Sequence, residues 1–157
     1  MQTPIAATAT IPVNASPDRT RAAALALDPV RIVRARGLIP GVTAVSGQTG
    51  PWSAEGQTRR LTLSDGATAE ETLIALEPGG YRYRVANFTG PFRFLVKEAN
   101  ARFEIAPRAE GSMLTWSYEF TPTGGLAAAI LSFLVDSQWN AFMDAALERL
   151  KSEIERA

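Results

Sequence analysis

Residues 111–135 read GSMLTWSYEFTPTGGLAAAILSFLV, and the two halves of this stretch follow different hydrophobic patterns. In the first half, Leu114, Trp116, Tyr118 and Phe120 alternate with polar residues. Successive side chains of a β-strand point to opposite faces, so these four side chains share one face. The first half is therefore predicted to be a strand with a buried aromatic face.

The second half begins a helical pattern that runs from Leu126 to about Arg156, after Gly124 and Gly125 end the strand. Most large apolar side chains of this segment fall on one broad arc at about 100° per residue. They are Leu131, Val135, Trp139, Phe142, Met143, Ala146, Leu147, Leu150 and Ile154. Ile130 and Leu134 lie on the opposite side, so we expect a loop, a second subunit or a membrane surface to cover them, with a homodimer favoured over membrane contact.

Upstream of this stretch, short runs of residues are separated by turn formers such as Ser64-Asp65-Gly66 and Pro78-Gly79-Gly80. Short runs between turns are typical of sequential antiparallel strands. With the strand already described, the predicted strands cover residues 42–46, 57–63, 68–76, 81–88, 94–106 and 113–121.

The N-terminal part predicts one more strand and two short helices. Ile11, Val13 and Ala15 alternate with less apolar residues, as in a strand with one buried face. Ser16-Pro17 and Asp28-Pro29 are N-cap and first-turn signatures. The first helix is expected to reach about Leu27, and Gly37 to end the second.

This order predicts an α+β fold in a single domain over residues 1–157, a length that fits one hydrophobic core. A curved antiparallel sheet of seven strands would wrap around the long C-terminal helix, because each buries the apolar face of the other. The two short helices after the first strand would close one end.

The composition excludes several kinds of site. Sixteen basic residues balance sixteen acidic residues, so we expect no nucleic-acid partner. The chain has no Cys and no His, which removes thiol nucleophiles, the usual zinc sites and the Ser-His-Asp triad. We therefore expect no metal and no cofactor, and any chemistry would use Asp, Glu, Arg, Lys, Tyr, Ser or Thr.

The distribution of apolar residues predicts a cytoplasmic protein without a transmembrane segment. Residues 1–9 contain no Lys or Arg and no long apolar run, so they do not resemble a secretory signal. The strongly apolar run from Leu126 to Val135 is about half the length that a spanning helix needs.

Several fragments resemble the SRPBCC superfamily, which includes START domains, birch-pollen-type allergens, plant abscisic acid receptors and polyketide cyclases. The residues from Gly56 to Gly66, followed by Glu71-Thr72-Leu73 and Tyr81-Arg82-Tyr83, are similar to a hairpin of that superfamily. Ala15-Ser16-Pro17 resembles its first strand-to-helix corner. Gly111 to Trp116 resembles the start of its last strand, and Leu147 to Lys151 its terminal helix.

The resemblance implies a helix-grip fold with an apolar cavity between the sheet and the long helix. Members of the superfamily bind lipids, hormones, quinones or polyketides, and a minority catalyse cyclisation or hydrolysis. Fold alone does not decide function, so the site is argued from residues.

Strand alternation decides which side chains face the predicted cavity. By this rule, Arg59 points inward with its apolar neighbours on one strand, and Glu71 does so on the next, where Ala75 is also expected to point inward. The predicted ligand-binding residues are Arg59, Leu61, Leu63, Glu71, Leu73, Tyr83, Phe103, Trp116, Tyr118, Val135, Trp139 and Phe142.

Glu71 is the leading candidate, because a carboxylate on an inward face is costly unless it is paired or protonated. The superfamily resemblance implies that Glu71 faces the ligand cavity and helps hold ordered water, as the matching glutamate does in abscisic acid receptors. The alternative is an ion pair between Glu71 and Arg59 that only stabilises the sheet.

Other polar residues carry similar alternatives. Tyr83 and Tyr118 either orient a ligand or are core aromatics with satisfied hydroxyl groups. Asp136 either touches ligand or is solvated. The basic run of Arg31, Arg34 and Arg36 is either a solvated helix face or a site for an acidic lipid head group.

The expected function is reversible binding, for storage, transport or sensing, of a small hydrophobic or amphipathic ligand in the cavity. The alternative is a cofactor-independent enzyme of the cyclase, aromatase or dehydratase type, in which a carboxylate or a tyrosine moves protons and Arg59 polarises a carbonyl. A third possibility is a module that binds a partner through the outer apolar surface of the helix.

Overall fold

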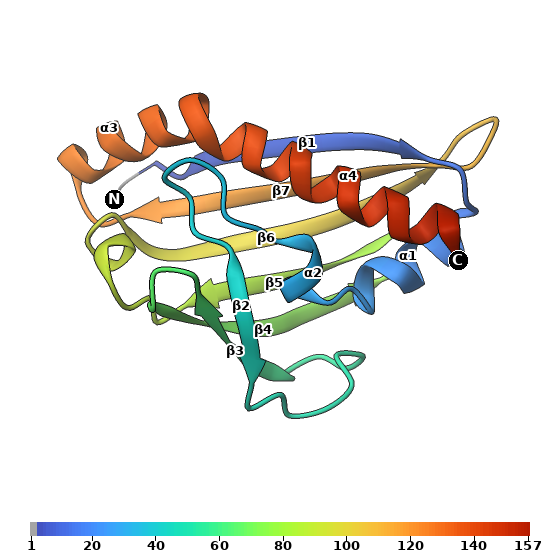
Figure 1. Cartoon of the computed structure of the whole chain (residues 1–157), viewed down its shortest axis with the longest axis horizontal. Coiled ribbons are helices and arrows are strands. Elements are labelled where there is room, and N and C mark those ends of the chain that lie inside the picture. Colours follow the sequence, from blue (N-terminus) through green and yellow to red (C-terminus); the bar gives the residue numbers. More distant parts are fainter. Residues whose placement is uncertain (1–2) are drawn as a thin grey trace.

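The computed structural model describes residues 3–157. Seven strands and the helices follow one another in the predicted order (Figure 1). The strands are β1 (Ile5–Val13), β2 (Val42–Ser46), β3 (Thr58–Leu63), β4 (Thr68–Glu77), β5 (Gly80–Ala86), β6 (Val96–Pro107) and β7 (Ser112–Pro122). The helices are α1 (Pro17–Leu25), α2 (Pro29–Ile32), the 3₁₀ turn η1 (Pro91–Phe94), α3 (Gly125–Leu134), the π-helical turn η2 (Val135–Trp139) and α4 (Asn140–Arg156).

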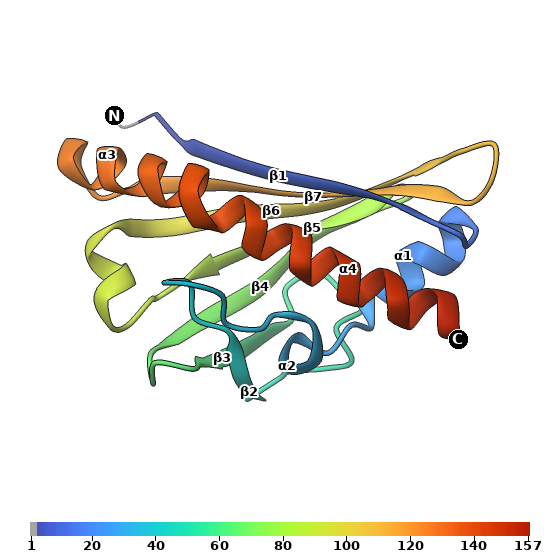
Figure 2. The same cartoon turned by 45° about the horizontal axis from the view of Figure 1, so that its top comes forward.

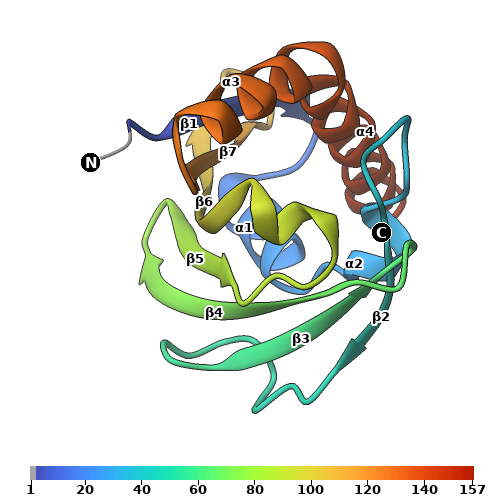
Figure 3. The same cartoon turned by 90° about the vertical axis from the view of Figure 1, so that its left-hand side faces the viewer.

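All seven strands form one antiparallel sheet in the order β1-β7-β6-β5-β4-β3-β2. The sheet bends strongly, and α3, η2 and α4 form one continuous helix across its concave side (Figure 2). Viewed along that helix, α1 and α2 lie at the far end of the space between helix and sheet (Figure 3). The predicted fold class, a curved seven-stranded sheet around a long C-terminal helix, is confirmed.

The core lies between the concave face of the sheet and the long helix. The predicted apolar arc of the helix is buried there, except for Trp139, which is half-buried. Polar contacts fix the ends of the grip: Ser112 Oγ donates to the carbonyl of Ala15, and Arg19 Nη2 donates to the carbonyl of Ile154 at 2.7 Å. The first bond attaches the corner before α1 to β7, and the second attaches α1 to the last turn of α4.

The turn before β7 depends on Gly111, which has a φ of +84°. A Cβ atom at this position would lie 2.2 Å from the carbonyl oxygen of Val13. Both the backbone conformation and the close approach of β1 therefore require glycine.

Several predicted boundaries differ from the structure. The first strand starts at Ile5, six residues before the predicted Ile11. Pairing with β7 extends the strand over this part of the chain, where the small side chains give only a weak alternation pattern. The second short helix ends at Ile32 and not near Gly37, since Arg36 and Ile39 form a β-bridge there. The segment predicted to start a strand at residue 94 is instead the turn η1.

A register shift in β4 overturns the prediction that Ala75 points inward. Leu73 pairs with Tyr83, but Ala75 pairs with the outward-facing Arg82, so one extra residue stands between these pairs. Such a bulge reverses the alternation. Leu76, opposite Tyr81, takes the inward position.

Candidate functional site

Two cavities lie between the sheet and the long helix. The first, here called the inner cavity, has a volume of about 60 Å³, and the second, the outer cavity, about 80 Å³. Five residues line both cavities and separate them: Val33, Val42, Leu61, Glu71 and Tyr118. Glu71 and Tyr118 are the polar members of this shared wall.

Ten of the twelve predicted ligand-binding residues line these cavities. Arg59, Tyr83, Phe103 and Trp116 lie on the inner cavity, as do Leu61, Glu71 and Tyr118. Leu63, Trp139 and Phe142 lie on the outer cavity. The other two, Leu73 and Val135, are packed in the core and line neither cavity, so their assignment to the cavity wall is wrong.

The misplaced pair has a physical explanation. An inward side chain lines a cavity only where its neighbours leave a gap, and the alternation rule does not report gaps. Leu73 is fully buried beside the bulge in β4, and Val135 begins the π-helical turn. Both side chains fill interior space completely. The alternation rule predicts that they point inward but not whether a cavity lies beside them.

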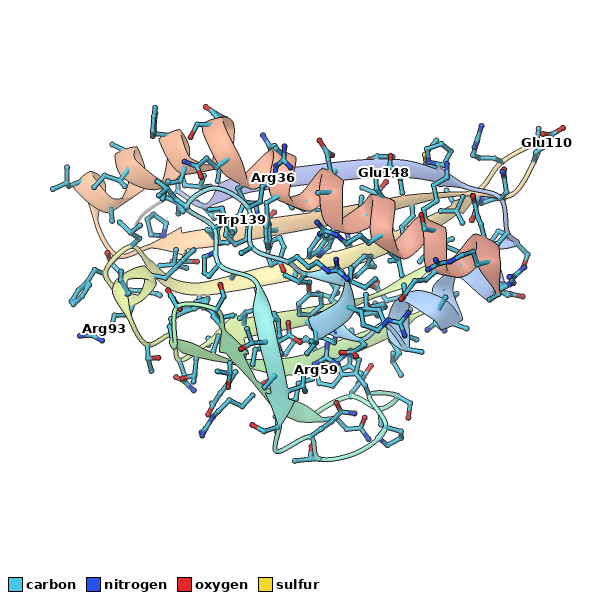
Figure 4. All side chains as sticks on the ribbon, in the orientation of Figure 1. Arg36, Arg59, Arg93, Glu110, Trp139 and Glu148 are labelled. Atoms are coloured by element: carbon cyan, nitrogen blue, oxygen red, sulfur yellow. The ribbon has the colours of Figure 1, made fainter. Side chains whose placement is uncertain are left out.

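Arg59 and Glu71 form a buried ion pair on the inner cavity wall (Figure 4 shows the position of Arg59). Arg59 Nε donates to Glu71 Oε1 at 2.7 Å, and the two residues are only 9% and 6% exposed. Within residues 3–157, the remaining polar atoms of the pair, the two Nη groups of Arg59 and Oε2 of Glu71, make no hydrogen bond. The pair therefore neutralises charge but leaves donors and an acceptor unused.

Burial raises the pKa of Glu71 above the ordinary value of a carboxyl group, and the nearby Arg59 opposes the shift. A raised pKa makes proton uptake by Glu71 easier than at a solvated glutamate.

Trp52, in the loop between β2 and β3, covers the other side of Arg59. The guanidinium carbon lies 4.0 Å from the centre of the indole ring, a cation–π contact. Trp52 is buried and has a φ of +58°, rare for a bulky residue. Trp52 could not be predicted from the sequence, because a loop residue with unusual backbone geometry carries no periodic signal.

Three aromatic side chains form a hydrogen-bonded chain on the same wall. Trp116 Nε1 donates to the Tyr83 hydroxyl at 3.0 Å, and the hydroxyl groups of Tyr83 and Tyr118 are 3.1 Å apart. The chain has three hydrogens to donate but contains only two bonds. One tyrosine O–H therefore has no acceptor in the part of the chain that the structure describes.

The tyrosines remain neutral donors. Burial raises the pKa of Tyr83 and of Tyr118 well above that of a free phenol, and nearby Glu71 raises both further. Tyr81 also faces the inner cavity, but its hydroxyl donates to the carbonyl of Ala24 at 2.9 Å and is satisfied by α1.

Aromatic rings make up much of the remaining wall. Phe103 stacks on Trp116 with ring centres 5.3 Å apart. Trp139, on the sheet side of the long helix, packs edge-on against Tyr118 and Phe120 (Figure 4). The π-helical turn places Trp139 one residue out of α-helical phase, and such turns are frequent at functional sites.

Loop residues complete the wall of the outer cavity. Like Trp52, they were not among the predicted site residues. Ile39 and Pro40 come from the loop before β2, and Phe88 and Phe92 come from the segment between β5 and β6. Phe88 stacks on Phe92 with ring centres 5.1 Å apart. Phe92, in the predicted turn between the strands 81–88 and 94–106, was the available signal, since turns are usually polar. Phe88 was assigned to the end of the strand 81–88, which in the structure ends at Ala86.

Two other features of the molecule are weaker candidates for a binding site. Asp136 is exposed and lines neither cavity. A larger hollow of about 560 Å³ lies on the outer face of the sheet, but its arginines are already paired: Arg82 with Glu77 at 3.3 Å and Arg102 with Glu104 at 3.4 Å. Neither feature combines an apolar wall with hydrogen-bonding groups that lack a protein partner, as the two cavities do.

Within residues 3–157, no group of three or more acidic side chains is arranged to hold a metal ion. One helix, Gly125–Arg156, is long and apolar enough to cross a membrane by length and composition alone. This is the helix whose apolar arc forms the core of the fold, and core helices pass the same test.

Comparisons with known proteins agree with this architecture. Residues 4–155 match the sequence family described as "Polyketide cyclase / dehydrase and lipid transport". No curated protein matches the chain at a significant level.

Solved structures with similar folds have low sequence identity to the chain. Ara h 8.0201 is 12% identical with a TM-score of 0.69, and the match covers 98% of this chain and 99% of that one. Major latex-like protein 151 from Panax ginseng is 13% identical with a TM-score of 0.70, covering 97% and 98%. The KanY protein is 19% identical with a TM-score of 0.67, covering 99% of both chains. At these identities the likeness shows the fold alone.

Proposed function

The chain belongs to the "Polyketide cyclase / dehydrase and lipid transport" family, and we propose that it reversibly binds a small hydrophobic or amphipathic molecule in the cavities between sheet and helix. One observation carries the proposal. Unused donors, the Nη groups of Arg59 and one tyrosine O–H, lie on an otherwise aromatic and aliphatic wall. A donor on a cavity wall that has no protein partner is free to bond a ligand or water, so one of these is expected to satisfy them.

The unused groups define the chemical class of the ligand. Arg59 and the tyrosine offer hydrogens, so the ligand presents acceptor oxygens such as carbonyl or hydroxyl groups. Phe103 stacks on Trp116, and Tyr118 packs against Trp116 at a tilt, so these rings favour a flat apolar body. We therefore propose an oxygenated aromatic or polycyclic compound.

The cavities are smaller than such a ligand. Volumes of about 60 and 80 Å³ hold a few water molecules, since one water needs about 10–15 Å³ on this scale. A ligand would join the two cavities by displacing the side chains that separate them. Leu61 and Val42, which have no polar contacts to lose, are the residues best placed to move.

Native mass spectrometry of the protein purified from its own cells tests the proposal. The expected result is a co-purifying small molecule that dissociates on denaturation and whose retention falls in the Tyr118→Phe variant. The Tyr81→Phe variant is the matched control, because the Tyr81 hydroxyl is already bonded to Ala24. Detection of the bare chain only, from cells that make the family's ligands, would contradict the proposal.

Catalysis is the second candidate, and the raised pKa of Glu71 favours it. Glu71 could remove a proton beside a ligand carbonyl while Arg59 and the neutral tyrosine O–H stabilise the oxygen, as cyclisation or dehydration of a polyketone requires. The test is the absorbance of a linear triketone thioester with and without protein. Product formation that Glu71→Gln abolishes and Glu70→Gln does not would establish an enzyme.

The cellular setting and the partners are also proposals. We infer a cytoplasmic protein that forms a homodimer through the outer surface of α3. On this surface Leu126 and Phe133 are 78% and 68% exposed, and Ile130 is 41% exposed. Ile130 is thus covered only in part within the described chain, and Leu134 is half-buried, so a second subunit is the further cover that we propose for this surface.

A further inference from the structure

A hollow of about 290 Å³ lies on the molecular surface between α2 with the segment that follows it and the last turns of α4. We call it the arginine hollow. Its lining consists of Arg31, Arg34, Glu148, Arg149, Ser152, Glu153 and Arg156. It is separate from the two internal cavities, with which it shares no lining residue.

Positive charge is in excess in the arginine hollow. Four arginines face two glutamates, a surplus of two positive charges in a chain with a net charge of zero. Arg31 pairs with Glu153 at 2.5 Å. The other three arginines have no carboxylate within 4.0 Å in the part of the chain that the structure covers.

Arg149 is the fixed point of the cluster. Its side chain is half-buried, and Nη1 donates to the carbonyl of Ile32 at 3.1 Å, which orients the guanidinium toward α2. Burial lowers the pKa of Arg149, and so do the nearby charges of Arg34 and Arg36. Arg36 lies on the loop that crosses beside the long helix, and Glu148 lies on the helix itself (Figure 4). The arginines thus repel one another at close range.

We propose that the arginine hollow binds a phosphate group between Arg34, Arg149 and Arg156. Guanidinium groups bind phosphate oxygens in pairs of parallel hydrogen bonds, and a surplus of two charges matches a phosphate monoester. A bound dianion would relieve the repulsion among the arginines. The carboxylate of Glu148 sets one limit of the site, because it repels an anion bound on its side.

The backbone connects the arginine hollow to the inner cavity. Ile32 and Val33, between Arg31 and Arg34, line the inner cavity, and so does Leu150, which follows Arg149. The phosphate is therefore either a free anion or the head group of an amphiphile whose apolar part lies toward the cavity. The phosphate site does not depend on the proposed function, and only the amphiphile source rests on it.

Titration with inorganic phosphate and with dodecyl phosphate below its micelle concentration, each followed by calorimetry, tests the site. The test variant is Arg34→Gln/Arg149→Gln. A second variant, Arg34→Gln/Arg36→Gln, changes only exposed side chains without hydrogen-bond partners and is expected to fold. Both variants should bind dodecyl phosphate at least tenfold more weakly than wild type. The control Arg93→Gln/Arg108→Gln makes the same charge change at exposed positions elsewhere and should bind as wild type does.

The outcomes separate the two sources of phosphate. Tighter binding of dodecyl phosphate than of inorganic phosphate, lost in the arginine variants, supports the head group, and equal binding of both supports a free phosphate. A loss in the control equal to that in the arginine variants would overturn the proposal, because it would show attraction by total charge alone. Unchanged affinity in the Arg34→Gln/Arg36→Gln variant would overturn it as well. Dodecanol has the same alkyl chain without the anion, so its binding reports on the internal cavities alone. Absence of dodecanol binding would therefore count against the proposed function and not against the phosphate site.

Discussion

Arg59 and Glu71 are direct cross-strand partners on β3 and β4, and their side chains meet in a buried 2.7 Å contact on the concave face of the sheet. The pair combines two readings that the sequence left open. It is an ion pair within the sheet, and it also lines the inner cavity with hydrogen-bonding groups unused. A purely structural pair at this depth would be expected to satisfy both partners fully.

The pH dependence of stability should reveal the buried carboxyl group of Glu71. Its pKa is raised in the folded chain, so the folded state holds the proton more tightly than the unfolded state, whose carboxyl pKa is about 4.3. The free energy of unfolding therefore falls as pH rises from the unfolded to the folded pKa. The Glu71→Gln variant lacks this component, so its stability relative to wild type should increase with pH over that interval in urea denaturation.

Glu70 provides the control with the opposite sign. It is the next residue on β4, faces solvent, and has a pKa lowered by hydrogen bonds from Asn87 and Arg60. The ionised Glu70 carboxylate contributes to the free energy of unfolding, and this contribution is lost as pH falls through the folded-state pKa. The stability of Glu70→Gln relative to wild type should therefore not increase with pH. The same pH trend in both variants would show that Glu71 does not titrate as a buried group.

Glycine at position 111 should be required for close packing as well as for backbone conformation. Gly111 and Gly56 have nearly equal φ values, +84° and +87°, but only at Gly111 would a Cβ atom meet another chain segment, the carbonyl oxygen of Val13. Gly111→Ala should therefore lower the free energy of unfolding by about 1–3 kcal/mol more than Gly56→Ala does. Chemical denaturation of both variants measures the difference, and equal losses would indicate backbone strain alone.

The surface of α3 should control the oligomeric state. Replacing Leu126 and Phe133 with Gln and Ser removes exposed apolar area without touching the core. Sedimentation equilibrium should then show a shift from dimer to monomer at equal stability. A wild-type protein that is already monomeric at high concentration would contradict the proposed homodimer.

The fold could be predicted from the sequence because the alternation and helical arcs are long and regular. Alternation in residues 113–121 assigns the faces of β7 correctly, and the arc from Leu131 to Ile154 assigns the buried side of the helix. Order along the chain then allows few topologies, since sequential antiparallel strands usually pair with their neighbours. The bulge in β4 was missed, because no Gly or Pro marks it.

The candidate site could be predicted only in part. Inward strand positions placed Arg59, Glu71 and Tyr118 on the cavity wall correctly. The cation–π cover from Trp52 and the cavity walls from Ile39 and Phe92 come from loops, whose paths depend on tertiary contacts. Cavity volume depends on how well all neighbours pack, which periodicity does not report.

A fluorescence titration with a hydroxynaphthoquinone tests most directly whether the wall formed by Arg59, Glu71 and the tyrosines binds a ligand. Trp116 and Trp139 lie at the cavities and should be quenched on binding. Tyr118→Phe should weaken binding about 2–13-fold, as expected for one lost hydrogen bond of about 0.5–1.5 kcal/mol. Glu71→Gln should change the affinity and its pH dependence, while Glu70→Gln should change neither. Quenching that is absent, or equal affinities in wild type, Tyr118→Phe and Glu71→Gln, would contradict the account.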